Sequence, residues 1–199
     1  MPNVVLVAGP VVDMASAARA LADAIGLQVV SAGNVFRDHV QQQTPLGKEA
    51  NRYMQAGHLV PNELMVRAIA EVLTHVDGSW VMYNFPRDIR QAELLTQSGH
   101  APNAVIELSL TEDQGRLAAQ RRVEHRIELD SQQAERRQEL LLLYSRSQET
   151  YQEQVDPLRA YYRADGLWQT VNGFGDFEDV AGRLIQIISD VSSGCLRLR

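Results

Sequence analysis

Cysteine is nearly absent from this sequence, since Cys195 is the only one in 199 residues. A single thiol excludes an internal disulfide framework and leaves no cysteine cluster for a metal ion. The histidines are scattered without the spacing of metal ligands, so no metal site is predicted. Cys195 stands in a polar C-terminal tail, where we expect an ordinary surface thiol.

Long apolar runs are absent as well. No stretch approaches the roughly 20 apolar residues that a membrane-spanning helix needs, and the N-terminus lacks the pattern of a secretory signal. Basic residues are not in excess either, because the formal net charge is −6, which argues against general nucleic-acid binding. We therefore expect a cytoplasmic protein that binds neither membranes nor nucleic acid.

What is present is the composition of a globular chain, with 45% hydrophobic and 22% charged residues. The length suffices for one α/β domain and is too short for two independent ones. Short apolar runs alternate with helical patterns, and this order predicts a parallel sheet covered by helices on both faces. The predicted strands are residues 4–8, 27–30, 80–83, 104–110 and 168–173.

Helical patterns separate these strands. Gly26 is a helix stop, while Thr44 and Pro45 form a favoured helix start, because threonine caps the N-terminus and proline suits the first turn. Pro157 is expected to end or bend a long C-terminal helix. The predicted helices cover residues 16–24, 31–40, 45–57, 62–73, 91–97, 134–155 and 180–188, with a charged helical segment from residue 112.

The helix that begins at Ala134 and ends at Val155 carries an apolar patch from Leu140 to Leu143. If the patch were exposed, it would mark an interface with a protein partner. If it packed against the rest of the chain, it would simply belong to the core. We expect core packing, with a protein partner at this helix as the alternative.

The junction between the first strand and the first helix has the position of a phosphate site. Glycine amides and a helix N-terminus converge there on an anion in many α/β proteins. A working cradle also needs several glycines, a lysine and a hydroxyl that binds magnesium. Gly9 and Ser16 fit, whereas Asp13 brings a negative charge and Met14 brings no cation. On these residues alone, an ordinary strand and helix is the simpler interpretation.

Four later segments stand out: Ser31-Ala32-Gly33-Asn34-Val35-Phe36-Arg37, Thr44-Pro45-Leu46-Gly47-Lys48, residues 54–64, and Phe85-Pro86-Arg87 followed by Gln91-Ala92-Glu93. In this order they resemble the adenylate kinase family of nucleoside monophosphate kinases. Further similar residues follow near the C-terminus: Tyr151, Pro157, Tyr162 and Val171-Asn172-Gly173. The resemblance implies a P-loop nucleoside monophosphate kinase-like fold in one domain over residues 1–199. It places a helical monophosphate-binding insertion at residues 31–64 and an altered helical lid at about 115–150.

The resemblance also implies roles in a monophosphate site. Arg37 and Arg87 match the arginines that hold the phosphate, a task suited to the forked donors of guanidinium. Gln91 matches the glutamine that reads adenine. Other positions of the implied nucleotide site are Gly33, Val60 lining the base pocket, Asn34 in place of an aspartate, and Asn84 in place of a glycine.

The donor side departs from the family. A count without gaps puts the family's phosphate loop on residues 9–16, with Met14 at the lysine, Asp13 at a glycine, and Tyr83 at the aspartate that organises magnesium. Positioning and charge neutralisation are nearly all that a phosphoryl-transfer site contributes, so their combined removal implies loss or change of the reaction. AMP or another nucleoside monophosphate is the implied ligand, whereas Mg-ATP is a doubtful one.

The lid region is rich in arginine. By the same resemblance Arg122, Arg126 and Arg137 are the candidates for the catalytic arginines that surround a transferring phosphoryl group. The alternative is a solvated helix whose arginines pair with nearby glutamates: Glu124, Glu128, Glu135 and Glu139. For each single arginine we favour the paired helix.

These observations lead to one main hypothesis and three alternatives. The main hypothesis is an adenylate-kinase-like protein that keeps part of the AMP site, has lost the ATP-magnesium site, and acts as a sensor, scaffold or remodelled enzyme. One alternative is a functioning kinase that converts ATP and AMP into ADP, with lid arginines replacing the lysine. The others are a protein-interaction module on the kinase fold and a different reaction on a phosphorylated small molecule.

Overall fold

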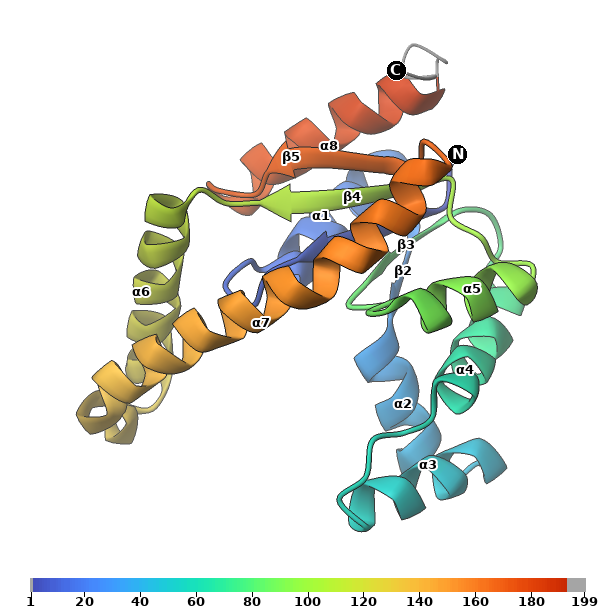
Figure 1. Ribbon diagram of the computed structural model, residues 1–199, viewed down its shortest axis with the longest axis horizontal. Helices are drawn as coiled ribbons and strands as arrows, with labels where there is room; N and C mark the ends of the chain where they lie inside the picture. Colours follow the sequence, from blue (N-terminus) through green and yellow to red (C-terminus); the bar gives the residue numbers. More distant parts are fainter. Residues whose placement is uncertain (1, 193–199) are drawn as a thin grey trace.

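The computed structural model describes residues 2–192, so Cys195 lies outside the described residues. Its centre is a parallel sheet of five strands, with the order β2-β3-β1-β4-β5 (Figure 1). The strands are β1 (Val4–Ala8), β2 (Gln28–Ser31), β3 (Trp80–Tyr83), β4 (Ala104–Ser109) and β5 (Trp168–Asn172). The predicted parallel sheet is therefore confirmed, with β2 shifted slightly toward the C-terminus.

Helices cover both faces of this sheet. Because side chains alternate along a strand, Val4 and Leu6 of β1 pack into one apolar cluster and Val5 packs into another. Helices α1 (Met14–Ile25) and α8 (Phe177–Ser192) complete the first cluster. Helices α4 (Asn62–Thr74), α5 (Ile89–Gln97) and α7 (Arg137–Ala164) complete the second. The three-layer α/β architecture expected from the sequence is confirmed.

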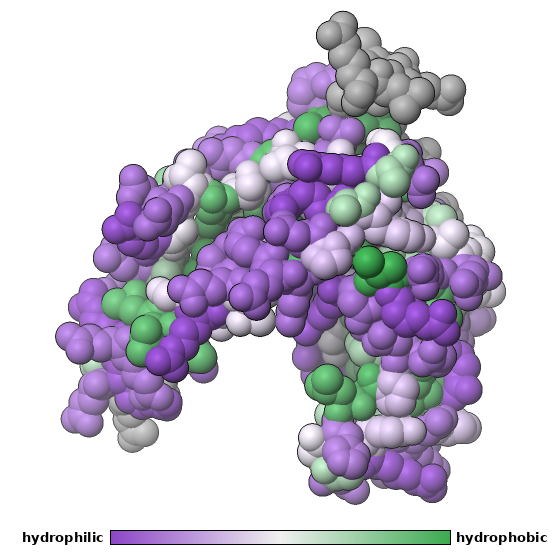
Figure 2. All heavy atoms as spheres, viewed as in Figure 1, coloured by the Kyte–Doolittle hydropathy of each residue, from purple (hydrophilic) through white to green (hydrophobic). Residues whose placement is uncertain are grey.

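Two groups of helices project from the sheet (Figure 1). The first contains α2 (Ala32–Gln41) and α3 (Pro45–Gln55), which pack with α4. The second contains α6 (Glu112–Leu129), the 3-10 helix η1 (Ser131–Arg136) and the first turns of α7. A hollow separates the projections in Figure 2. Within residues 2–192, no helix has both the length and the apolar character needed to cross a bilayer.

The long C-terminal helix differs from its prediction. It begins after η1, at Arg137, and it passes through Pro157 to end at Ala164, so both predicted ends were wrong. Proline removes one helical hydrogen bond, but Val155 and Leu158, on either side of it, are buried in the core and hold the helix in place.

The leucine patch on α7 is only partly buried. Leu140 is 3% exposed, whereas Leu142 and Leu143 are 51% and 54% exposed. The expected core packing is therefore correct for Leu140 and wrong for Leu142 and Leu143, because successive helical residues point in different directions and only one side of α7 faces α6.

Gly47 allows α2 and α3 to pack closely. A Cβ atom added at Gly47 would lie 2.0 Å from the backbone oxygen of His39. We expect Gly47→Ala to lower the free energy of unfolding by about 1 to 3 kcal/mol, measured by urea denaturation, because the backbone of α2 must shift. Gly182→Ala in α8 is the control: nothing lies within 4 Å of the added atom, and removing a helical glycine should stabilise the fold slightly. Equal effects of the two substitutions would contradict this view of Gly47.

Candidate functional site

The junction after β1 is organised as a helix cap. Asp13 is the N-cap of α1, and its carboxylate accepts hydrogen bonds from the Ser16 amide at 3.2 Å and the Ser16 hydroxyl at 2.8 Å. Burial raises the pKa of Asp13, but the hydrogen bonds from Ser16 and the charge of Arg122 together hold that pKa below its ordinary value. Asp13 and Ser16 are therefore hydrogen-bonded to each other in the N-terminal cap of α1. Helix α1 begins at Met14, two residues before its predicted start.

Two side chains of this junction, Val11 and Met14, are buried, whereas Asp13 is exposed. Met14 and Val11 are each 8% exposed, and Met14 packs with Ala17, Ala18 and other residues of α1. A thioether supplies no positive charge for a phosphate. The position that resembles the phosphate-loop lysine thus belongs to an apolar cluster, and it also lines the cavity described below.

Helix α7 covers Gly9. A Cβ atom added at Gly9 would lie 2.1 Å from Oε1 of Gln148, so this carboxamide rests directly on the glycine. The same Oε1 atom is buried and has no hydrogen-bond partner among the described residues. The glycine that would face a phosphate faces the Gln148 side chain instead.

A cavity of about 380 Å³, here called the inner cavity, opens at the carboxyl end of the sheet. Its walls come from the end of β1, the start of α1, the loop after β3, and one side of α7. They consist of Leu6, Val7, Ala8, Pro10, Met14, Asn84, Phe85, Pro86, Arg87, Arg146, Ser147, Thr150, Tyr151, Gln154, Val155 and Leu158. Ligands of open α/β sheets bind at this end of the strands.

A second cavity of about 920 Å³, the outer cavity, lies between the α2–α4 projection and α5. The apolar residues that line it are Phe36, Met54, Leu59, Val60, Met65, Ile89 and Pro157. The polar and charged residues that line it are Asn62, Arg87, Asp88, Arg90, Gln91 and Gln154. Arg87 and Gln154 line both cavities, so the two spaces adjoin at these side chains.

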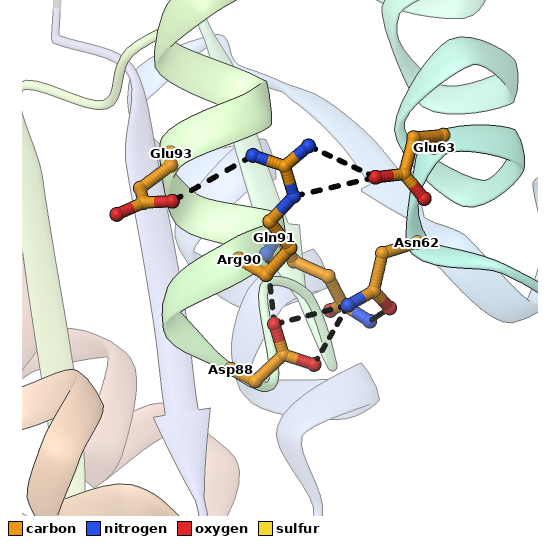
Figure 3. Close-up of polar contacts among 6 residues, drawn as sticks. All are labelled: Asn62, Glu63, Asp88, Arg90, Gln91 and Glu93. Atoms are coloured by element: carbon orange, nitrogen blue, oxygen red, sulfur yellow. Dashed lines mark hydrogen bonds and ion pairs between the residues drawn. The ribbon is translucent and has the colours of Figure 1, made fainter.

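Gln91 is held in one orientation at the wall of the outer cavity. It is 5% exposed, and its Oε1 accepts from the Arg87 amide at 2.8 Å. Its Nε2 donates to Asn62 Oδ1 at 2.9 Å (Figure 3). Asn62 in turn donates to Asp88 at 3.2 Å, and Asp88 caps α5. Gln91 Nε2 also donates to the Met65 sulfur at 3.8 Å, so both of its amide hydrogens have partners within the protein.

The structure brings together only part of the monophosphate site that the sequence suggested. Val60, Arg87 and Gln91 line the outer cavity, and Asn84 lines the inner one. Asn84 has a φ of +62°, a conformation that favours glycine and that asparagine tolerates better than most residues. Its carbonyl oxygen accepts from Arg87 Nε at 3.1 Å, which orients the guanidinium.

Gly33, Asn34 and Arg37 stand apart from this group. The Arg37 guanidinium donates to the Asn34 side chain and lies near Gly33. Within the described residues, these three are not among those that line either cavity. Their assignment to the nucleotide site stays a prediction.

The candidate lid arginines also lie outside both cavities of the described structure. Arg137 forms an ion pair with Glu124, which joins α7 to α6, as the paired-helix interpretation expects. Arg122 lies close enough to Asp13 to lower its pKa. The catalytic roles suggested for Arg122, Arg126 and Arg137 stay predictions.

Sequence reasoning missed Arg146 and Gln148, which reach the inner cavity and Gly9 from α7. A signal was available in the helical spacing, because Ser147, Tyr151 and Leu158 recur on one side of α7. This spacing points to the cavity only when the correct first and last residues of α7 are known.

A buried ion pair fastens α7 to the sheet. Glu107 of β4 is 4% exposed, and its carboxylate accepts from Arg159 Nη2 at 2.7 Å and Nε at 3.1 Å. The Tyr151 hydroxyl donates to the same carboxylate at 3.2 Å. Burial and the charge of Glu107 raise the pKa of Tyr151. This pairing fixes the side of α7 that faces the inner cavity.

The five-stranded parallel sheet, the helices around it and the cavities at its carboxyl end define a P-loop nucleoside monophosphate kinase-like α/β protein. The sequence profile of the family described as adenylate kinase matches residues 6–167, and the chain belongs to that family. It is 30% identical over 194 residues to an adenylate kinase of Nocardioides sp., covering 94% of this chain and 96% of that protein. It is 32% identical over 176 residues to adenylate kinase 1 of Synechocystis sp., covering 84% and 87% of the two chains. An adenylate kinase of Thermus thermophilus is 30% identical over 185 residues, with coverage of 91% and 94%.

Proposed function

We propose that this chain binds a nucleoside monophosphate, with AMP as the first candidate, and does not transfer a phosphoryl group from Mg-ATP. The observation that carries the proposal is the contrast between the two sides of the site. Arg87 and Gln91 line the outer cavity. The junction between β1 and α1, called the donor junction, instead has a buried Met14 and a Gly9 that is covered by Gln148. Such a protein would act as a sensor, a scaffold or a remodelled enzyme.

The outer cavity suits a nucleoside monophosphate. Its apolar walls, including Val60 and Met65, offer surface for a base. Gln91 Nε2 donates to the Met65 sulfur, a weak acceptor that a base nitrogen would replace with a stronger hydrogen bond. Arg87 stands at the boundary with the inner cavity, where its forked donors can bind the phosphate.

The donor junction does not suit a magnesium-bound triphosphate. Phosphoryl transfer relies on cations that neutralise the developing charge. Met14 supplies none, and the ionised Asp13 would repel the β- and γ-phosphates. Tyr83 is half-buried at the end of β3, where its phenol contributes no negative charge to hold a hydrated magnesium ion.

Isothermal titration calorimetry with AMP, ADP and ATP, each with and without magnesium, tests the proposal. We expect AMP to bind with equal affinity in both buffers, because Arg87 needs no metal to bind a phosphate, and we expect magnesium not to strengthen ATP binding. Tight, magnesium-dependent binding of ATP would overturn the proposal.

A functioning kinase is the second candidate, favoured by near full-length similarity to proteins named adenylate kinase. In that case Arg122, close to Asp13, would supply charge to the donor side. A coupled assay for ADP formation decides between the nucleotide-binding protein and the functioning kinase. If the chain is a kinase that uses Arg122, Arg122→Ala should lower the rate of ADP formation. Met14→Lys is the gain-of-function variant, since Met14 lines the inner cavity and a lysine there would bring a positive charge to that cavity.

An interaction module is a further candidate, favoured by the exposure of Leu142 and Leu143 on α7. It is compatible with monophosphate binding, because the two side chains lie outside the residues that line the cavities in the described part of the chain.

A further inference from the structure

The inner cavity continues the proposed monophosphate site. Arg87 and Gln154 line both cavities, so one molecule can extend from the outer cavity past Arg87 into the inner one. The inner volume of about 380 Å³ lies in the range that small-molecule sites occupy. A ligand that filled only the outer cavity would leave the inner cavity without any ligand atoms.

The lining of the inner cavity is apolar where it is deepest in the core. Leu6, Phe85, Val155 and Leu158 are each at most 2% exposed. Among the described lining residues, the only charged ones are Arg87 and Arg146, and both are exposed. Neither arginine is part of the buried wall, so the interior itself carries no charge.

The hydroxyl groups of this cavity already donate to the protein. Ser147 Oγ donates to the carbonyl oxygen of Leu143 at 2.8 Å, and Thr150 Oγ1 donates to that of Arg146 at 3.1 Å. The Tyr151 hydroxyl donates to Glu107 at 3.2 Å. A phosphate requires donors, and these three groups present only acceptor lone pairs to the cavity.

These contacts decide which chemical group the inner cavity accepts. The side-chain N–H donors of the lining belong to the exposed residues Asn84, Arg87, Arg146 and Gln154. A second phosphate placed against the buried wall would lose its hydration and meet no donor there, which is strongly unfavourable. An apolar group would lose only its contact with water, which is favourable in proportion to its area. Arg87, at the boundary, can still bind a single phosphate group.

We infer that the ligand of this protein is a nucleoside monophosphate whose phosphate is esterified to an apolar group, that is, a phosphodiester. The nucleoside occupies the outer cavity, the phosphate lies at Arg87, and the apolar substituent fills the inner cavity. This inference rests on the proposed monophosphate site and names the substrate class of that site.

Calorimetry with AMP and with its methyl, butyl and hexyl phosphate esters tests the inference. We expect affinity to rise with chain length by about fourfold for each methylene that becomes buried, until the cavity is full. If AMP binds and the longer esters bind no more tightly than the methyl ester, the inference fails while the proposed function stands. If neither AMP nor any ester binds, the proposed function fails as well.

Two serines of α7 provide a matched pair of variants. Ser145 and Ser147 each donate a hydrogen bond to the carbonyl oxygen four residues earlier, but only Ser147 lines the inner cavity. Ser147→Phe should fill the cavity and abolish the gain in affinity with chain length. Ser145→Phe should retain that gain. A gain that persists in the Ser147 variant, with its helical content confirmed by circular dichroism, would overturn the inference.

Discussion

Replacing Arg159 by alanine is expected to lower the free energy of unfolding by about 3 kcal/mol. Arg159 supplies two hydrogen bonds to the Glu107 carboxylate, whose side chain is only 5% exposed. Without the guanidinium, the buried Glu107 carboxylate retains the Tyr151 hydroxyl as its one side-chain partner among the described residues. Urea denaturation followed by circular dichroism measures the loss.

The double variant Glu107→Gln, Arg159→Ala separates two effects of removing Arg159: the unpaired buried charge of Glu107 and the lost packing of the Arg159 side chain. A neutral carboxamide removes the buried charge, and its oxygen can still accept from Tyr151. We expect the double variant to be more stable than Arg159→Ala alone by at least about 1 kcal/mol. If the two variants are equally stable, the main contribution of Arg159 is its packing over the Trp168 ring, where its guanidinium carbon lies 5.8 Å from the ring centre.

The central strands β1, β3 and β4 could be predicted from the sequence because their residues are buried almost throughout. Runs such as Val4–Ala8 are apolar throughout, which is typical of a parallel sheet between two helical layers. The first and last residues of the helices were harder to predict from the sequence. The rule that proline ends a helix failed at Pro157, because the burial of Val155 and Leu158 against the sheet outweighs one lost hydrogen bond.

The residues proposed to bind a monophosphate lie close together in the sequence, whereas the contact over Gly9 joins distant segments. Arg87 and Gln91 belong to one short segment, so the loop after β3 and the first turn of α5 bring them together locally. The cover over Gly9 depends on Gln148, which is remote in sequence and reaches the junction only because of the path of α7. The sequence shows Met14 where the family resemblance implies a lysine, but it could not show that the Gln148 side chain lies over Gly9.

Replacing Arg87 by alanine is expected to weaken AMP binding by about 100-fold, the loss of about 2.7 kcal/mol that charged hydrogen bonds to a phosphate can supply. Stability should change little, because the side chain is exposed and its Nε donates to the Asn84 carbonyl oxygen on the surface. Arg37→Ala should have a smaller effect, since Arg37 is not among the described residues that line the cavities. Calorimetry with AMP measures both variants.

Arg67→Ala is the control for net charge. Arg67 is exposed and pairs with Glu49 at 3.0 Å, away from the lining of both described cavities, so its removal changes the charge equally without changing the site. Arg87→Lys then separates charge from geometry, because lysine keeps the positive charge and loses the forked donors. An intermediate loss for lysine would show that Arg87 binds the phosphate through two hydrogen bonds. If Arg87→Ala and Arg67→Ala weaken binding equally, Arg87 acts only through the general field of the protein, and the phosphate lies elsewhere.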